Sequence, residues 1–219
     1  ERFLNVDLSR INYMTTGRVY QTVIEKERNL EYAGKCVEVV PHIPLEVIRR
    51  INVAQKEVNA DVVIIEIGGT IGEYQNMLFL EAARMMKIKH PQDVFFTVVS
   101  YLPVPSKVGE MKTKPTQMAV RTLNGSGILP DIILARGESR LDAKRKEKIA
   151  FMCNVLPERV ISAPDVDSVY DVPINFEKEG LGDILCEIMG TTCSAETGKN
   201  AQAWKKFVGK VHTAKDEVR

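Results

Sequence analysis

The sequence predicts an α/β fold with a mostly parallel, doubly wound sheet, and three observations support this fold class. Short runs rich in Val and Ile alternate with segments of helical period along most of the chain. The runs are continuously apolar, which suits strands that are covered on both faces. The helical segments between them have the length of right-handed β-α-β crossovers.

Four apolar runs and a weaker fifth are the expected strands. They are bounded by polar or turn residues, and they are Val37–Val40, Asp61–Glu66, Val94–Tyr101, Asp131–Arg136 and, more weakly, Arg159–Ser162. Val and Ile fit the pleated, buried surface of a parallel sheet. We therefore expect these runs to pair with one another in one sheet.

Apolar residues at three- and four-residue spacing predict the helices that join these strands. In Leu45–Val58 this spacing puts Leu45, Ile48 and Ile51 on one face and leaves Arg49 and Arg50 outside. The other expected helices are Asn12–Leu30 (capped by Thr15 or Thr16), Met77–Ile88, Thr116–Leu123, Asp142–Cys153 and Leu181–Met189.

The pattern weakens towards the end of the chain. We expect Gly190–Lys199 to be a loop and Ala201–Val211 to be a terminal helix or linker. The predicted organisation is one domain over residues 1–190, followed by a C-terminal loop and helical linker over 191–219.

Composition excludes several classes of protein. The 219 residues are 44% hydrophobic and 27% charged, and 30 Lys and Arg against 29 Asp and Glu give a formal charge of +1. No overall field recruits nucleic acid or acidic lipid, and no stretch of about 18 apolar residues spans a membrane. The four cysteines are scattered and no secretory signal precedes them, so we expect reduced thiols and a cytoplasmic location.

An acid and a glycine-rich turn follow the second run, as Glu66-Ile67-Gly68-Gly69-Thr70-Ile71-Gly72. Ligands of open α/β sheets bind beyond the carboxyl ends of the strands. A carboxylate there suits Mg²⁺, and glycines let backbone N–H groups approach phosphate oxygens. The alternative is a glutamate at a strand end beside glycines that only turn the chain.

Basic residues follow the next two runs. Lys112-Thr113-Lys114-Pro115-Thr116-Gln117 begins an expected helix, where the lysines and the helix N-terminus would attract an anion. Arg136 ends the fourth run and can bind phosphate or stack on a base. The alternatives are solvated surface lysines and a surface salt bridge. The run Lys144–Lys148 is typical of a solvated helix face.

Two of these segments, Glu66–Thr70 and Gly109–Gln117 (GEMKTKPTQ), resemble the synthetase (amidoligase) domain of the CTP synthases. The GEMKTKPTQ run is highly specific for that family. Further matching segments run in collinear order along essentially the whole chain: Thr15–Tyr20, Val40–Ile43, Phe79–Ala82, Pro130–Ile133, Cys153–Asn154 and Asp165–Tyr170.

The resemblance implies a P-loop NTPase-like fold of the dethiobiotin synthetase type and a two-step ligase reaction. ATP phosphorylates the 4-oxygen of UTP, and ammonia derived from glutamine then displaces the phosphate to give CTP. The implied cofactor is Mg²⁺, with Glu66 as its ligand. The implied partners are ATP, UTP, inhibitory CTP and further copies of the chain, in a dimer to tetramer, with no nucleic acid and no membrane.

The resemblance also assigns the other site residues. Lys112 and Lys114 are the expected catalytic residues. The expected UTP- and CTP-binding residues are Lys112, Thr113, Lys114, Pro115, Thr116, Gln117 and Lys148. For Lys148, the resemblance replaces the interpretation as part of a solvated helix face. The expected ATP-binding residues are Arg136, Pro164, Asp165 and Val166. Glu73, Tyr74 and Gln75 fall where the family binds inhibitory CTP but replace its usual Asp-Ile-Glu, so the strength of CTP feedback does not carry over.

In the family, a phosphate loop and a second Mg²⁺-binding aspartate precede the matched stretch, and a glutamine amidotransferase domain follows it. We therefore expect this chain to be the middle and end of the synthetase half, inactive alone. The alternative is a non-catalytic module derived from that domain, which binds UTP or CTP or assembles oligomers. A partition-type ATPase is disfavoured because it would need the phosphate loop and would not need KTKPTQ.

Overall fold

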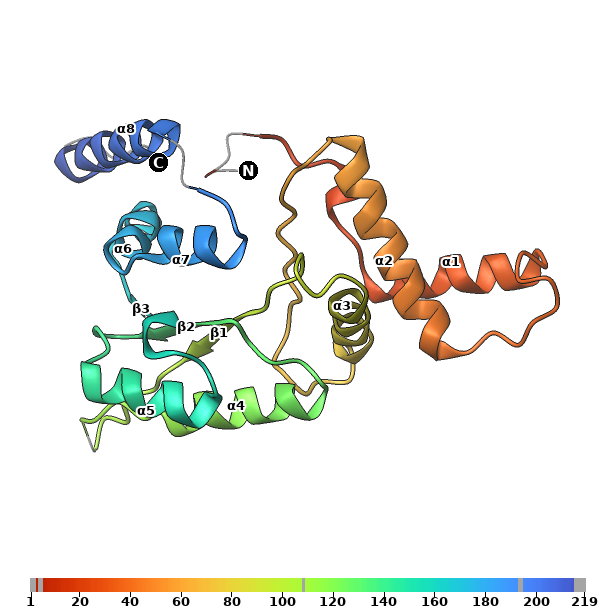
Figure 1. Ribbon diagram of the computed structural model, residues 1–219, viewed down its shortest axis with the longest axis horizontal. Helices are drawn as coiled ribbons and strands as arrows, with labels where there is room; N and C mark the ends of the chain where they lie inside the picture. Colours follow the sequence, from red (N-terminus) through yellow and green to blue (C-terminus); the bar gives the residue numbers. More distant parts are fainter. Residues whose placement is uncertain (1–2, 4–5, 108, 193–194, 215–219) are drawn as a thin grey trace. The chain divides into compact units, whose positions relative to one another are not determined.

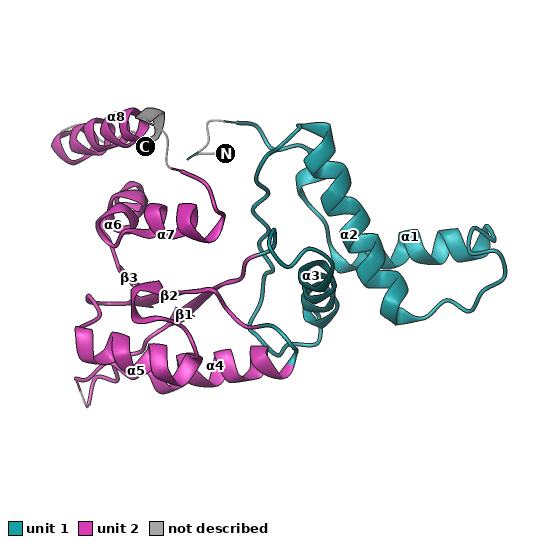
Figure 2. Ribbon diagram, viewed as in Figure 1, with its two compact units in different colours: residues 1–94, 126–128 teal, residues 95–125, 129–219 magenta. Residues whose placement is uncertain are grey.

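The computed structural model describes residues 3, 6–107, 109–192 and 195–214, and it has α/β architecture (Figure 1). The chain divides into two compact units (Figure 2). Unit 1 comprises residues 1–94 and 126–128, and unit 2 comprises 95–125 and 129–219. The described part of unit 1 is helical, whereas unit 2 contains a parallel sheet. The predicted α/β class with parallel strands is confirmed.

Helices form the core of unit 1. Its elements are η1 (Arg10–Asn12), α1 (Thr16–Arg28), α2 (Val39–Glu57) and α3 (Met77–Lys89). The hydroxyl of Thr15 accepts a hydrogen bond from the Arg18 N–H at 3.3 Å, so Thr15 is the N-cap of α1 and the helix begins later than Asn12. Buried apolar residues from all three α-helices form one cluster: Val19, Val23, Ile43, Val47, Ile51 and Ala82.

Two of the expected strands are wrong. In Val37–Val40, the last two residues begin α2, with Val40 in extended backbone before the cis Val40–Pro41 peptide bond. The run Asp61–Glu66 is irregular, and Ile64 within it is 89% exposed. A strand needs neighbours for its backbone hydrogen bonds, and no strand among the described residues pairs with either segment.

The other three apolar runs form the sheet of unit 2. Its order is β1 (Thr97–Tyr101), β2 (Ile132–Gly137) and β3 (Val160–Pro164), and both pairings are parallel. The register sets Tyr101 opposite Arg136 and Gly137 opposite Pro164, so the three carboxyl ends share one edge.

Helices cover both faces of this sheet, as Figure 1 shows for α4 and α5 below it and α6 and α7 above it. α4 (Lys114–Gly125) connects β1 to β2, and α5 (Ala143–Cys153) with η2 (Pro157–Arg159) connects β2 to β3. Asp142 caps α5, because its carboxylate accepts the Arg145 N–H at 2.8 Å. The fully buried residues include Leu102, Ile132, Ile133, Ile149, Val160 and Ile161.

A partly buried ion cluster also connects elements of unit 2. The Glu179 carboxylate accepts hydrogen bonds from Lys146 Nζ at 2.7 Å, Arg140 at 2.9 Å and the Ser162 N–H at 3.1 Å. Burial alone would raise the pKa of Glu179, but Lys146 and the Ser162 N–H outweigh it and lower that pKa. Glu179 thereby connects α5 to β3.

The C-terminal elements are η3 (Val169–Asp171), α6 (Val172–Lys178), α7 (Leu181–Ile188) and α8 (Ala195–Thr213). α8 begins inside the stretch expected to be a loop, so that expectation is wrong from residue 195; residues 193–194 lie outside the described part. The indole N–H of Trp204 donates to the Tyr170 carbonyl at 3.0 Å, and the Tyr170, Trp204 and Phe207 ring centroids lie 5.1–6.0 Å apart. This aromatic cluster packs α8 on η3, which stabilises the helix despite Gly198 near its start.

The expectation that the cysteines carry reduced thiols is only partly met. Cys36 and Cys153 are free, and burial raises the pKa of the Cys153 thiol to about 11. Cys186 is disulfide-bonded, so the expectation of reduced thiols is wrong for this residue. Among the described residues, no helix combines the length and the apolar character needed to cross a membrane.

Candidate functional site

The basic segment Lys112–Gln117 lies at the carboxyl end of β1, where it enters α4. The loop before it folds back on itself, because the Lys112 N–H donates to the Pro103 carbonyl and the Gly109 N–H to the Pro105 carbonyl, both at 2.9 Å. Ligands of parallel α/β sheets bind at this edge. The position of the segment therefore agrees with a binding role.

The hydroxyl and amide side chains of this segment are buried. Thr116 is 0% exposed, and its hydroxyl lies 2.8 Å from that of Ser100 on β1. The Gln117 side-chain amide donates to the Thr113 hydroxyl at 3.0 Å. These side chains hold the first turn of α4 against the sheet, so a ligand meets the backbone N–H groups of the helix N-terminus, the half-buried Lys112 and the exposed Lys114 and Pro115.

Cationic side chains from α5 extend this basic surface. Lys112 Nζ lies 2.9 Å from one Glu110 carboxylate oxygen, and Arg145 lies 3.2 Å from the other. The Lys112 ammonium, and then Arg145, lower the pKa of Glu110. Lys148 is exposed one helical turn beyond Arg145, and neither Lys114 nor Lys148 forms an ion pair with a described residue. The surface thus carries an excess of positive charge.

A hollow of about 410 Å³ opens between the loops that follow β1 and β2. This volume lies within the range of roughly 300–1,000 Å³ that is usual for small-molecule sites. Charged side chains dominate its lining, which includes Glu110, Met111, Glu138, Arg140, Asp142 and Arg145. Arg140 was not predicted, and Arg145 was predicted only as part of the solvated basic run Lys144–Lys148. The place of Arg140 in the loop after the expected strand Asp131–Arg136 is the signal that could have identified it.

The predicted ATP-binding residues of unit 2 also lie together. Arg136 NH2 donates to an Asp165 carboxylate oxygen at 3.2 Å, and the Asp165 N–H donates to the Gly137 carbonyl at 2.8 Å. The Arg136 side chain is 59% exposed. An exposed pair of this kind is worth about 0–1 kcal/mol. Arg136 can therefore leave Asp165 for a phosphate at little cost.

The acidic and glycine-rich segment lies in unit 1, ahead of α3. Gly69 has φ +94°, and a Cβ there would meet a Glu73 carboxylate oxygen at 2.9 Å, so the turn requires glycine. The Asn76 side-chain amide closes the turn by donating to the Thr70 carbonyl at 2.8 Å.

The predicted metal and CTP-binding residues border this turn. Glu66 is exposed, Tyr74 is 90% exposed, and the Gln75 side-chain amide donates to the Glu73 carboxylate. The described residues contain no group of three or more His, Cys, Asp or Glu side chains that could hold a metal ion. Glu66 offers a single carboxylate, which fits Mg²⁺ because that ion commonly takes one or two carboxylates together with water and substrate phosphates.

The chain is similar to known CTP synthases along its whole length. A family model described as "CTP synthase N-terminus" matches residues 1–191. The CTP synthase of Pyrococcus abyssi is 45% identical over 219 residues, which are 100% of this chain. That of Methanopyrus kandleri is 44% identical over 220 residues, also 100% of this chain, and that of Bacillus subtilis 41% identical over 213 residues, or 96%. The chain spans about 40% of the length of these relatives.

Proposed function

The chain belongs to the CTP synthase family, and from this premise we propose that it forms part of the synthetase half of an enzyme that converts UTP to CTP. In the proposed reaction ATP phosphorylates the 4-oxygen of UTP, and ammonia from glutamine displaces the phosphate. The observation that carries the proposal is the segment Lys112–Gln117 at the carboxyl end of β1, with Lys114 exposed, Lys112 half-buried and its other polar side chains buried.

In this proposal the basic surface of unit 2 binds the triphosphate of UTP. Lys112 and Lys114 neutralise phosphate charge, and the first backbone N–H groups of α4 donate to phosphate oxygens. Lys148 on α5 adds a third ammonium group. Thr113, Thr116 and Gln117 act indirectly, because their hydrogen bonds fix the position of the segment.

The proposed ATP-binding residues are Arg136, Pro164, Asp165 and Val166. Arg136 exchanges the Asp165 carboxylate for a nucleotide phosphate, and the loop beyond β3 contacts the base. Glu66 would hold Mg²⁺, which when bound neutralises charge on the transferring phosphoryl group. Glu73, Tyr74 and Gln75 are the proposed contacts of inhibitory CTP.

The remaining details are part of the same proposal. They are a P-loop NTPase-like sheet of the dethiobiotin synthetase type, a synthetase domain over residues 1–190 with a linker over 191–219, a homo-oligomer, and a cytoplasmic location. Their support is the family membership together with the parallel sheet and the terminal helix α8.

Nucleotide titration of the full-length protein tests the proposal. Lys112→Ala and Lys114→Ala each remove a charge-assisted contact, so each should weaken UTP binding by roughly ten- to a hundred-fold. ATP binding should change far less, because Arg136 and Asp165 belong to a separate element. Lys107→Ala is the matched control, since Lys107 is exposed on the same loop.

Three outcomes would contradict the proposal. Unchanged UTP affinity in both variants would show that the two lysines are solvated surface residues with no role in UTP binding. Equal weakening of UTP and ATP would indicate a general electrostatic or folding defect. UTP binding by the unmodified full-length protein without CTP formation from ATP and free ammonia would favour the non-catalytic module.

A further inference from the structure

Four arginines line one small hollow in unit 1. The hollow has a volume of about 140 Å³, and its lining includes Arg10, Arg18, Arg49 and Arg50 together with Tyr13. Arg10 comes from η1, Arg18 from the first turn of α1, and the other two from α2. Segments separated in the sequence thus bring four permanently charged residues to the lining of one hollow.

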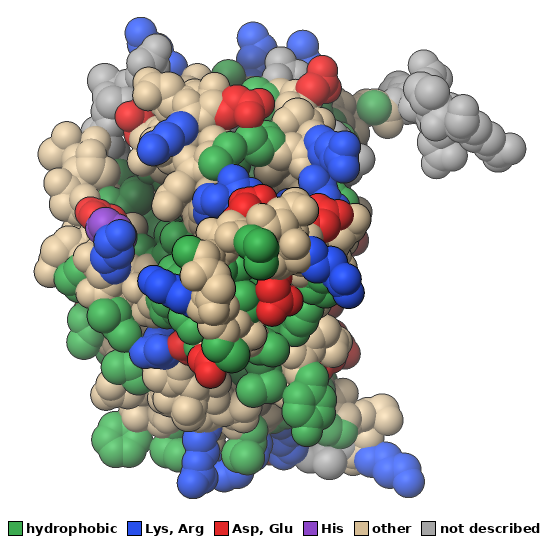
Figure 3. Space-filling model, turned by 90° about the vertical axis from the view of Figure 1, so that its right-hand side faces the viewer, with side chains coloured by type: hydrophobic (Ala, Val, Ile, Leu, Met, Phe, Trp, Pro, Cys, Tyr) green, Lys and Arg blue, Asp and Glu red, His purple; other side chains and the backbone are tan. Residues whose placement is uncertain are grey.

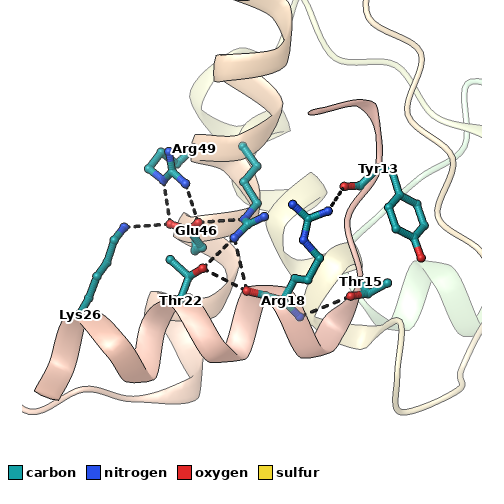
Figure 4. Close-up of polar contacts among 8 residues, drawn as sticks. Tyr13, Thr15, Arg18, Thr22, Lys26, Glu46 and Arg49 are labelled. Atoms are coloured by element: carbon teal, nitrogen blue, oxygen red, sulfur yellow. Dashed lines mark hydrogen bonds and ion pairs between the residues drawn. The ribbon is translucent and has the colours of Figure 1, made fainter. Parts of the chain in front are cut away.

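Among the described residues, the only carboxylate that forms ion pairs with these arginines is that of Glu46, which pairs with Arg49 and Arg50. Glu46 is buried and already fully engaged: Arg49 donates to both of its oxygens at 2.7 Å, Arg50 Nε to one at 2.9 Å, and Lys26 to the other at 3.0 Å. Figure 4 shows Lys26 reaching Glu46 from α1 and Arg49 from α2. Neither Arg10 nor Arg18 forms an ion pair with a described residue. Glu46 is therefore paired with Lys26, Arg49 and Arg50, and Arg10 and Arg18 have no counter-ion among the described residues.

The arginines also retain unused donors. Each guanidinium has five N–H donors. Arg18 donates from NH1 to the Tyr13 carbonyl at 3.0 Å, and Arg50 donates from NH2 to the Thr22 hydroxyl at 2.8 Å and to the Arg18 carbonyl at 3.3 Å. Arg10 makes no side-chain hydrogen bond to a described residue. These contacts hold the guanidinium groups of Arg18 and Arg50 in place and leave N–H groups for a further acceptor.

We propose that this hollow binds a phosphate or polyphosphate group. Four arginines line the hollow and a carboxylate pairs with only two of them, Arg49 and Arg50, so an anion with two or more charges would balance the remaining positive charge. The fork of N–H donors on arginine matches phosphate oxygens in pairs. The volume corresponds to about four or five water molecules, which suits a phosphate group and is far below the roughly 300 Å³ of a small-molecule pocket.

This site is distinct from the proposed function, because none of its residues belongs to the proposed UTP or ATP contacts. Basic side chains, blue, are interspersed with apolar and acidic ones on the molecular face drawn in Figure 3. General surface charge is therefore the alternative that an experiment must separate from a formed site. Arg28 provides the comparison, since it is exposed on α1 and forms no ion pair with a described residue.

Isothermal titration of the full-length protein with sodium tripolyphosphate, at constant ionic strength, tests the proposal. Arg10→Gln/Arg18→Gln should weaken the site by at least roughly ten-fold, because each arginine supplies charge-assisted contacts. Arg28→Gln removes a charge from the same helix and should leave the affinity within about two-fold. Parallel titrations with inorganic phosphate and with ATP show whether a free phosphate or a nucleotide tail is the source of the group.

Two results would overturn the proposal. One is an unchanged tripolyphosphate isotherm in Arg10→Gln/Arg18→Gln, provided that its circular dichroism and melting temperature match the unmodified protein. The other is an equal loss of affinity in Arg28→Gln, which would assign the binding to general surface charge. If the double variant does not fold, Arg10→Gln alone answers the question, since Arg10 has no side-chain hydrogen bond to a described residue to lose.

Discussion

The apolar run Asp61–Glu66 in unit 1 and the run Val94–Tyr101, which lies in unit 2 from Phe95 on, are both rich in β-branched residues but have different structures. The second contains β1, which pairs with β2 from Thr97↔Ile132 to Tyr101↔Arg136, and its Val98 is 4% exposed. The first is irregular, and its Ile64 is 89% exposed. The difference shows that a β-branched run becomes a strand only when a neighbour supplies its hydrogen bonds and a covering layer.

The two units are consequently stabilised in different ways. Unit 2 depends on a central strand whose residues are buried on both faces, with Ile132, Ile133 and Ala135 at most 2% exposed. Unit 1 depends on helices that pack through an apolar cluster and are connected by the Glu46 ion cluster. Three substitutions test this contrast, and they are given from the largest expected effect to the smallest.

Ile133→Ala should have the largest effect. Ile133 is 0% exposed on β2, where it lies opposite Val98 and Val160. Removing its buried methyl and methylene groups leaves a cavity, which costs about 2–5 kcal/mol of unfolding free energy. Urea denaturation followed by circular dichroism measures the loss. A loss below about 1 kcal/mol would contradict the assignment of β2 as the centre of the core.

Glu46→Gln should have an intermediate effect that depends on pH. Burial alone would raise the pKa of Glu46, but hydrogen bonds from Arg49 and Lys26 outweigh it and lower the pKa to about 2, from 4.5. The ionised group therefore stabilises the fold above about pH 4.5, by about 3 kcal/mol as an upper estimate. This stabilisation decreases as the pH falls through the folded pKa. Melting temperatures between pH 7 and pH 2 of the unmodified and Glu46→Gln proteins should differ at neutral pH and converge in acid.

Glu57→Gln is the matched control for Glu46→Gln. Glu57 lies on the same helix, is exposed and forms no salt bridge with a described residue, so its replacement should leave stability and its pH profile unchanged. Parallel curves for Glu46→Gln and the unmodified protein, with no convergence in acid, would show that Glu46 does not carry this stabilisation.

Ile64→Ala should have the smallest effect. An exposed side chain has little to lose on truncation, so the expected change in unfolding free energy is within about 0.5 kcal/mol. The same urea denaturation as for Ile133→Ala measures it, and the pair compares one substitution in two environments. A loss above about 1 kcal/mol would mean that Ile64 is buried in the folded protein and that the contrast between the two runs is wrong.

Local signals in the sequence predicted much of the fold. A cap at Thr15 or Thr16, the start of α3 at Met77 and the strand at Asp131–Arg136 depend on neighbours in the sequence, and the structure has the cap at Thr15 and the other two there or within one residue. The predictions that are wrong concern features that depend on tertiary contacts. Whether Asp61–Glu66 forms a strand depends on which segments lie beside it, and α8 is stabilised by aromatic contacts with η3 that no local pattern contains.

The candidate site shows the same limit. The sequence identified Lys112–Gln117 and Arg136 from their place after apolar runs, and it assigned Thr116 to nucleotide binding without indicating that its side chain is buried. The structure buries Thr116 against Ser100, a contact across 16 positions of sequence. The arginine-lined hollow of unit 1 was also missed, because its members converge only when α1 packs on α2.

The aromatic cluster beneath α8 gives the chain a built-in optical reporter. Trp204 is the sole tryptophan of the sequence, so excitation at long ultraviolet wavelengths addresses one indole. That indole is half-buried and hydrogen-bonded to the Tyr170 carbonyl, with Tyr170 and Phe207 in contact. Its emission maximum therefore reports whether α8 is docked on η3, and a shift to longer wavelength marks the moment at which the terminal helix separates.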